Sequence, residues 1–317
     1  EMSASLVGSE MCIRDRPKVV IRLLRWITGT FGPNWIKLSP NIHRIVVSSF
    51  TNETFSGYDL VIATATETAA YVNKANGEKV YFVQDFEDWG RSREEVLDTY
   101  RMDMKKITVS KWLKEIIDDV SPAEAVYIPN GIDNKMFLET IPYKNRGKHT
   151  LCTLFHWDER KGCDVALKII YKLKEHYPDF EAFLFGAPKR ENDWPEWIHY
   201  TEKAKPEEVA NTMNHARVFL CTSRQEGFGL TGLESIFCGC VLVTTDCRGI
   251  REYASQKNAY LCGVDHEQEL FESICSAFDN EEESNSKRKN CIETRTQFDA
   301  NKSKKRFYEE IISNLDH

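Results

Sequence analysis

Short runs rich in β-branched residues alternate with amphipathic stretches from Arg44 to the end of this chain. This alternation is typical of strands in a parallel sheet that is covered by helices. Apolar residues at steps of three and four predict helices over 93–105 and 110–120, and Ser110 is expected to cap the second of them. In the first half the predicted strands are 44–49, 59–65, 80–85, 106–110 and 125–130.

A second alternating series starts at residue 150, after the polar stretch 133–150, which contains Pro142 and Gly147 and predicts a domain junction. A chain of 317 residues is long enough for two cores. We therefore predict an α/β fold with domains over 17–140 and 141–298, and a C-terminal helix over 299–317 that packs back on the first domain. The second series comprises predicted strands at 150–157, 180–186, 197–201, 216–223, 241–246 and 259–263, helices near 162–176, 206–215, 230–239, 249–255 and 266–279, and two polar amphipathic helices over 281–316.

The first sixteen residues are set aside. LVGSEMCIRD at 6–15 resembles the in-frame translation of a transposon-type sequencing adapter, so residues 1–16 are interpreted as an artefact rather than a genuine disordered leader. On this reading the gene was cut upstream of Pro17, and we expect the first domain to be truncated.

The charge and composition of the chain limit the kinds of molecule that it is expected to bind. The net charge of −7 gives no support to a nucleic-acid partner, and the basic run 302–306 is interpreted as a solvated helix face. No window offers the roughly 20 apolar residues of a membrane-spanning helix, although peripheral membrane contact through 19–31 stays open. The cysteines lack paired CxxC spacing, and Cys238 and Cys240 are expected to be small core residues. A cytoplasmic, reducing compartment is therefore predicted.

The stretch RQEGFGLTGLESIFCGC at 224–240 places Glu226 and Glu234 on either side of seven residues that include three glycines. It follows a predicted strand, and a helix is expected to begin near Leu230. Glycines let backbone amides approach an anion, and a helix start is electropositive, so a phosphate is predicted near Gly227–Thr231. The two carboxylates, about 12 Å apart along a loop followed by a helix, would suit hydroxyls on both sides of that phosphate. The alternative is a capping Glu226 and a solvent-facing Glu234.

The residues EGFGLTGLESIFCGCVLVTTDCRGIREY at 226–253 resemble the donor-binding signature of retaining glycosyltransferases of family 4, the group 1 type with the GT-B fold. YIPNGID at 127–133, with Asn130 and Gly131, is similar to the interdomain segment of that family. HWDERKGCDVAL at 156–167 resembles the first loop of its C-terminal domain, and YFVQDFEDW at 81–89 is similar to members that make bacterial surface polysaccharides. The resemblance implies two Rossmann-like domains that face a cleft.

The resemblance also implies roles for individual residues. Glu226 would contact the sugar of a nucleotide diphosphate sugar, Glu234 its ribose, and Lys161 its diphosphate, with Arg160 as an accessory cation. Fixed cations and helix amides would stabilise the departing nucleoside diphosphate, so no metal or cofactor is expected. The acceptor would be a glycan or a lipid-linked molecule. The donor site implied by the resemblance also includes His156, Gly227, Phe228, Gly229, Leu230 and Thr231.

Three positions depart from the family pattern. His156 stands where the family usually has Arg, Arg248 where it often has Gly, and Gln84–Asp85 where a His is common. Asp85 is expected either to orient the acceptor or sugar or to cap the following turn. His156 is expected either to serve the donor site or to be a satisfied histidine at a strand end.

Other functions stay open at this point. An epimerase or phosphorylase of the same fold would be distinguished by product analysis, and a noncatalytic sugar-nucleotide-binding protein by tight binding without transfer. A dinucleotide dehydrogenase and a P-loop NTPase are disfavoured because their glycine motifs do not occur. The family's first strand and Gly-rich loop are not found over 17–44, so we expect an intact parent to be an enzyme and this chain to be weak or inactive.

Overall fold

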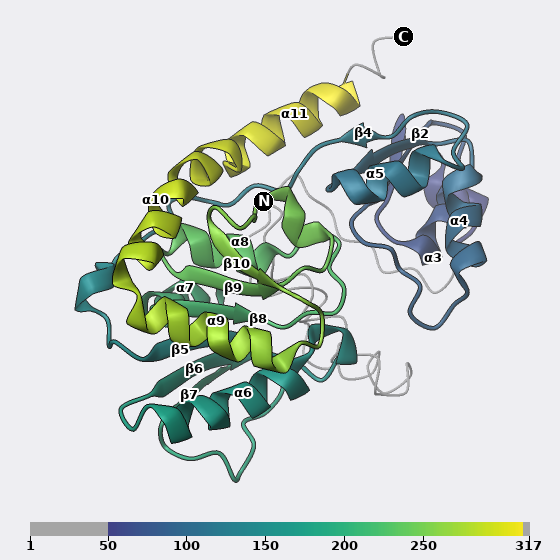
Figure 1. Ribbon diagram of the computed structural model, residues 1–317. Coiled ribbons are helices and arrows are strands. Elements are labelled where there is room, and N and C mark those ends of the chain that lie inside the picture. The colour runs from purple at the N-terminus through teal and green to yellow at the C-terminus, as the bar shows by residue number, and fades with distance from the viewer. Residues whose placement is uncertain (1–49, 313–317) are drawn as a thin grey trace, which may run out of the picture.

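The computed structural model describes residues 50–312 of the protein, arranged as two parallel sheets with helices (Figure 1). The predicted strand at 44–49, the adapter-like residues 1–16 and the membrane-contact segment 19–31 lie outside this part of the chain.

The first sheet has the order β1-β2-β3-β4, with all neighbours parallel. Its strands are β1 (Leu60–Ala63), β2 (Glu78–Val83), β3 (Lys105–Thr108) and β4 (Val126–Tyr127). They alternate with α3 (Thr66–Val72), α4 (Arg93–Arg101) and α5 (Lys111–Asp118), after an initial short turn, η1 (Asn52–Phe55). The seven-residue α3 was not predicted, because it is too short to show a helical period.

Ser110 occupies the N-cap position of α5, as predicted, but its side chain makes no capping hydrogen bond. Its hydroxyl is buried and has no hydrogen-bond partner among the described residues.

The second sheet has the order β10-β9-β8-β5-β6-β7. From β5 the chain builds outward through β6 and β7, then returns to the other side of β5 with β8, β9 and β10. Parallel sheets of this kind bind ligands where the strand order reverses, outside the carboxyl ends of the strands. Here that point lies between β5 and β8. The strands are β5 (Thr150–Phe155), β6 (Glu181–Gly186), β7 (Ile198–Glu202), β8 (Val218–Cys221), β9 (Val241–Thr245) and β10 (Ala259–Cys262).

Helices cover both faces of this sheet. One apolar core contains side chains from α6 (Cys163–His176) and α9 (Glu267–Asp279), and the other contains side chains from α7 (Pro206–His215) and α8 (Leu230–Phe237). Short turns η2 (Tyr143–Asn145) and η3 (Glu159–Lys161) flank β5. The helix predicted near 249–255 is a shorter 3₁₀ helix, η4 (Gly249–Glu252), because Tyr253 leaves the helical conformation at a φ of −134°.

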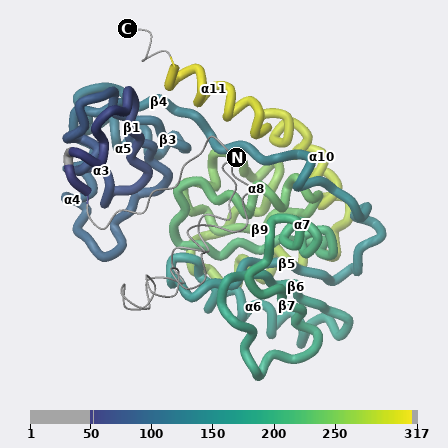
Figure 2. Tube along the Cα trace, turned by 180° about the vertical axis from the view of Figure 1, so that it is seen from behind, coloured from purple at the N-terminus to yellow at the C-terminus, as the bar shows by residue number. Residues whose placement is uncertain are grey.

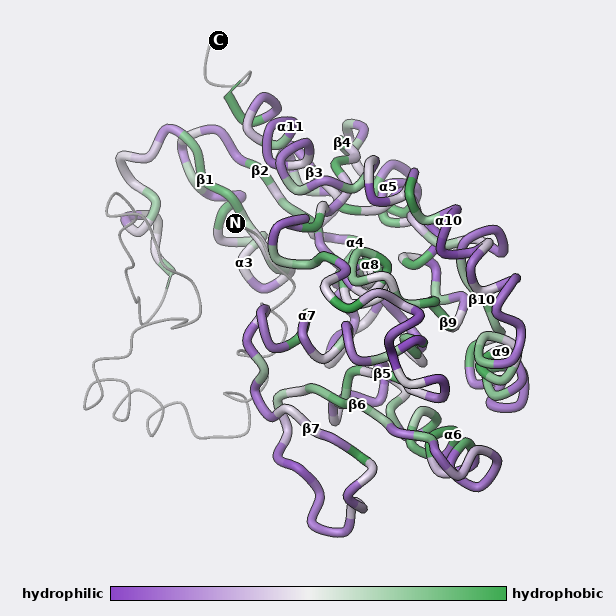
Figure 3. The backbone as a smooth tube through the Cα atoms, turned by 90° about the vertical axis from the view of Figure 1, so that its left-hand side faces the viewer, coloured by the Kyte–Doolittle hydropathy of each residue, from purple (hydrophilic) through white to green (hydrophobic). Residues whose placement is uncertain are grey.

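Two polar helices complete the chain. Helix α10 (Glu281–Gln297) lies against the second sheet's helices, and α11 (Ala300–Ile312) reaches the first sheet, as the two opposite views agree (Figures 1 and 2). The ring of Phe307 packs edge-on against Phe82 of β2, with centroids 5.1 Å apart. Figure 3 shows hydrophobic colour along β6 and largely hydrophilic colour along α10 and α11.

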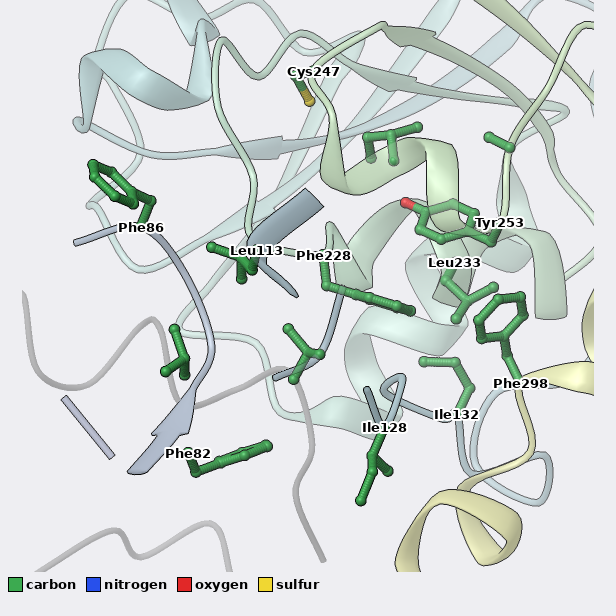
Figure 4. Close-up of a cluster of buried hydrophobic side chains, with 14 of the residues drawn as sticks. Phe82, Phe86, Leu113, Ile128, Ile132, Phe228, Leu233, Cys247, Tyr253 and Phe298 are labelled. Atoms are coloured by element: carbon green, nitrogen blue, oxygen red, sulfur yellow. The ribbon is translucent and has the colours of Figure 1, made fainter. Parts of the chain in front are cut away.

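The chain passes between the two halves twice, once in the linker after β4 and once in the turn between α10 and α11. Ile132 donates its N–H to the carbonyl of Phe298 at 2.8 Å, and Ala300 donates to the carbonyl of Ile132 at 3.0 Å. Asn130 and Gly131 therefore lie where the linker between the sheets meets the turn between α10 and α11. Beside this crossing an apolar cluster joins residues of both halves, including Phe82, Ile128, Phe228 and Phe298 (Figure 4).

Candidate functional site

An ion pair between Lys161 and Glu226 lies at the reversal point of the second sheet. Lys161 ends the loop after β5, and Glu226 lies in the loop after β8. Their Nζ and Oε1 atoms are 2.8 Å apart, and the hydroxyl of Ser223 donates to the same carboxylate oxygen at 2.7 Å. The side chains are 13% and 12% exposed, so the pair is shielded yet reachable.

The two loops are joined through their backbones. The N–H of Arg224 donates to the carbonyl of Arg160 at 2.6 Å, and the hydroxyl of Thr222 donates to the carbonyl of Lys161 at 3.1 Å. Gly162 makes this approach possible, because a Cβ there would lie 2.1 Å from the carbonyl oxygen of Thr222 and its φ is 61°. Gly162 therefore fixes the position of the preceding Lys161.

Arg160 lies beside this pair and faces the other half of the molecule. Asp158 accepts from its Nε at 3.1 Å and from its Nη2 at 2.5 Å. From the other half, the carboxylate of Asp85 lies 3.6 Å from Nη1, and the centre of the indole ring of Trp89 lies 3.9 Å from the guanidinium carbon. Asp85 and Trp89 belong to the loop after β2, so both sheets contribute to the site at their carboxyl ends.

Neighbouring charges in the site influence the pKa values of Asp85 and Lys161. Burial, reinforced by the nearby Glu226 carboxylate, raises the pKa of Asp85 to about 7. Burial alone would lower the pKa of Lys161, but Glu226 outweighs it and raises that pKa. Near neutral pH the site therefore holds a charged lysine and a partly protonated Asp85. The N-cap alternative for Asp85 receives little support, because among residues 50–312 its side chain accepts a hydrogen bond only from the adjacent N–H of Phe86 at 2.8 Å.

Helix α8 starts at Leu230, as predicted, with Gly229 as its N-cap and no side chain capping it. No acceptor for the N–H groups of Leu230 and Thr231 exists within residues 50–312. The first turn thus presents unpaired donors at the positive end of the helix, which favours an anion.

Position 227 needs a glycine because the backbone of the other half of the molecule packs closely against it. A Cβ at this position would lie 2.0 Å from the carbonyl oxygen of Gln84, and the carbonyl of Gly227 accepts from the indole N–H of Trp112 at 3.0 Å. The next residue, Phe228, is 3% exposed, and its ring packs against Tyr253 and Phe298 in the apolar cluster (Figure 4). The Phe228 side chain therefore lies away from Lys161.

Glu234 lies one turn into α8 and is 3% exposed, so the solvent-facing alternative is wrong. Among residues 50–312 its carboxylate has no hydrogen-bond or ion-pair partner, and burial raises its pKa to about 8. An unpaired buried carboxyl is costly unless a ligand or water supplies donors.

His156 and Arg248 have local partners. The Nδ1 of His156 accepts from the N–H of Asp158 at 2.9 Å, and burial, with Lys161 nearby, lowers the pKa of His156. This contact favours the interpretation of a satisfied histidine that shapes the loop. Arg248 has a φ of 58°, and its guanidinium carbon lies 5.7 Å from the ring centre of Trp112.

Cavity size does not single out this site. A cavity of about 450 Å³ lies elsewhere, beside the linker and the turn between α10 and α11, and its lining includes Glu139, Arg295 and Lys302. The space beneath Lys161 and Thr231 is only about 10 Å³. We place the candidate site at Lys161 because paired charges and free helix amides converge there. Among the described residues no cluster of His, Cys, Asp and Glu could hold a metal, and none of their helices is long and apolar enough to span a membrane.

The buried Glu234 predicts a pH-dependent stability. Its folded-state pKa of about 8 exceeds the value of 4.5 for an unperturbed glutamate, so the folded protein keeps a proton that the unfolded chain releases. The free energy of unfolding should therefore fall as the pH rises between these values, by on the order of 2 kcal/mol or more from this group. Glu234→Gln should remove that part of the fall, whereas Asp85 contributes equally to both proteins. Urea unfolding at pH 6 and pH 9 measures the difference, and equal losses in both proteins would contradict it.

Comparison with known proteins bears on the segment that carries Lys161, Glu226 and Glu234. Residues 148–280 match the family model described as glycosyl transferases group 1. The chain is also similar to a subunit of human phosphatidylinositol N-acetylglucosaminyltransferase, with 26% identity over 152 residues, which cover 45% of this chain and 31% of that protein. The chain therefore spans only about a third of this curated relative.

Solved structures show the fold. Sucrose-phosphate synthase from Thermosynechococcus elongatus aligns with a TM-score of 0.69 and 16% identity, over 82% of this chain and 75% of its own. Anabaena HepE in complex with UDP-glucose aligns with a TM-score of 0.68 and 17% identity, over 82% and 80%. The prediction of an α/β protein with two Rossmann-like domains of the GT-B type is confirmed.

The structure also contains residues that the sequence did not single out. Ser223 contacts Glu226, and Trp89 contacts Arg160. The indole of Trp112 contacts the loop at Gly227. Ser223 could have been found from its place at the end of β8, three residues before Glu226. The two tryptophans carry no local signal, because their contacts depend on how the halves pack.

Proposed function

We propose that the protein is a retaining, metal-independent glycosyltransferase that moves a hexose or deoxyhexose from a nucleotide diphosphate sugar to a glycan or lipid-linked acceptor. One observation carries the proposal: the Lys161–Glu226 pair lies at the reversal point of the second sheet, next to the unpaired amides of α8. The group 1 match over 148–280 and the UDP-glucose bound to the similar HepE support it. We also propose a cytoplasmic location with peripheral membrane contact, in line with the phosphatidylinositol in the human relative's name.

The chemistry follows from the charges. In this proposal the diphosphate lies over the start of α8 and accepts from the Lys161 ammonium and the amides of Leu230 and Thr231. As the bond between the sugar carbon and the phosphate oxygen breaks, negative charge grows on the diphosphate and these donors stabilise it. The acceptor oxygen bonds to the same face of the sugar carbon, and its proton passes to the departing phosphate oxygen.

The two acids would recognise hydroxyl groups. Glu226 lies beside Lys161, where the sugar would sit, and its second oxygen has no partner among residues 50–312. Glu234 lies one turn along α8, which suits the ribose. Sugar hydroxyls would supply the donors that the buried Glu234 carboxyl lacks.

The first test is a binding panel. UDP, GDP and ADP, and their glucose conjugates, are added to the chain in a thermal-shift assay without divalent metal. One base should raise the melting temperature, because a ligand that binds only the folded state stabilises it. No shift with any compound at millimolar concentration would contradict the proposal.

Glu226→Gln should separate the sugar from the diphosphate. Removing the charge frees Lys161, so the affinity for the preferred nucleoside diphosphate should stay within threefold or increase. The affinity for the matching nucleotide sugar should fall about tenfold, because a charged acceptor for sugar hydroxyls is lost. Isothermal titration measures both, and Glu159→Gln in the neighbouring loop is the exposed control. Equal changes for the two ligands would refute the role of Glu226.

A further inference from the structure

Trp89 and Arg160 form a contact between the two halves of the molecule. Trp89 lies in the loop after β2, and Arg160 lies in the loop after β5. The guanidinium carbon is 3.9 Å from the centre of the indole ring, which is close enough for a cation–π interaction. Both side chains are only partly exposed.

The hydrogen bonds of Arg160 leave one edge of its guanidinium available. Asp158 accepts from Nε and Nη2, which fixes that edge within the loop. Nη1 makes no hydrogen bond within residues 50–312, and its nearest carboxylate, that of Asp85, lies 3.6 Å away. A guanidinium presents its donors in a rigid plane, so an aromatic ring over one face sets the direction of the free edge.

Other contacts hold the first half, from the Trp89 loop and from α5, against the second half. The amide of Gln225 donates to the carbonyl of Phe86 at 3.1 Å, three residues before Trp89. The indole of Trp112 donates to the carbonyl of Gly227 at 3.0 Å. The stack on Arg160 therefore forms when these two loops lie together, and separation of the halves would remove it.

We propose that Trp89 is a positioning residue that holds the Arg160 guanidinium toward the oxygens of a bound diphosphate. The cationic site is then completed by both halves: the second supplies Lys161 and Arg160, and the first supplies the ring that orients Arg160. This inference rests on the proposed function. It makes the affinity for a diphosphate depend on the closed arrangement of the sheets.

A double-mutant cycle tests whether Trp89 acts through Arg160. The variants are Trp89→Ala, Trp89→Phe, Arg160→Ala and the double Trp89→Ala/Arg160→Ala, with the exposed Tyr58→Ala as an aromatic control in the same half. Affinities for UDP, GDP and ADP are measured by isothermal titration. Trp89→Ala should weaken the preferred diphosphate about five- to tenfold, Trp89→Phe two- to threefold, and Tyr58→Ala less than twofold. In the Arg160→Ala background, Trp89→Ala should change the affinity less than twofold.

Fluorine NMR of the otherwise unaltered chain provides a second readout that does not depend on the folding of Trp89→Ala. The protein is labelled with 5-fluorotryptophan, and the Trp89 resonance is assigned by its loss in Trp89→Phe. The preferred diphosphate should shift this resonance, and the shift should disappear in Arg160→Ala.

The outcomes separate the two proposals. If none of the diphosphates binds the parent chain, the proposed function fails and this inference fails with it. If the parent binds but the Trp89 resonance and the affinity of Trp89→Ala are unchanged, the inference is overturned and the proposed function stands. An equal loss in both Arg160 backgrounds would also overturn it, because Trp89 would then act by another route.

Discussion

Replacing Lys161 with methionine is expected to weaken binding of the preferred nucleoside diphosphate at least 100-fold. Methionine keeps the length of the side chain but removes a charge that would bond directly to phosphate oxygens in a shielded site. Charge-assisted hydrogen bonds of this kind are about twice as strong as neutral ones, and a single preorganised donor can change rates by about 10²–10³. Isothermal titration without divalent metal measures the loss.

The substitution also leaves the Glu226 carboxylate without its ion-pair partner, so a control variant is needed. In the double variant Lys161→Met/Glu226→Gln the unpaired charge is gone, and diphosphate affinity should stay at least 30-fold below that of the parent. Lys168→Met, an exposed position on α6, should bind normally. If Lys161→Met binds the diphosphate with an affinity within threefold of the parent, Lys161 does not bind the diphosphate.

Replacing Arg146 with methionine is expected to lower the free energy of unfolding by on the order of 3–5 kcal/mol. The side chain is 0% exposed and lies between the linker and the second sheet. It donates to the carbonyls of Ile141 at 2.9 Å, Ala216 at 2.7 Å and Cys238 at 2.6 Å. Its loss leaves several carbonyl groups buried without a donor.

Urea unfolding followed by circular dichroism measures this effect. Arg251→Met is the matched control, because Arg251 is 65% exposed and its ion pair with Asp246 should contribute no more than about 1 kcal/mol. If both variants unfold at the same urea concentration as the parent, Arg146 does not hold the linker to the sheet.

The local parts of the site could be predicted from the sequence. The short runs rich in β-branched and apolar residues located β5 and β8, and the glycines before an apolar stripe located the start of α8 at Leu230. The family resemblance implied that Lys161 and Glu226 both belong to the donor site, and their side chains do lie together. The positions of the strands and of the helix needed only short-range patterns, whereas the roles of Lys161 and Glu226 came from the resemblance.

Features that depend on packing between the halves could not be predicted. Gly227 looked like a phosphate-binding glycine, yet its lack of a side chain is explained by the carbonyl of Gln84, which packs against it from the other half. Phe228 was placed in the donor site, but its ring lies in the apolar cluster. Trp89 ends the stretch 81–89 that resembles the family, but nothing in the sequence placed it beside Arg160. The burial of Glu234 was also open, because an eight-residue helix with so few polar positions does not show which side faces solvent.

A crystal structure of the chain with its preferred nucleoside diphosphate would test the central claim most directly. We predict diphosphate oxygens within hydrogen-bonding distance of the Lys161 ammonium and of the amides of Leu230 and Thr231, with the ribose hydroxyls at Glu234. A diphosphate bound elsewhere, for example in the 450 Å³ cavity beside Arg295 and Lys302, would contradict it.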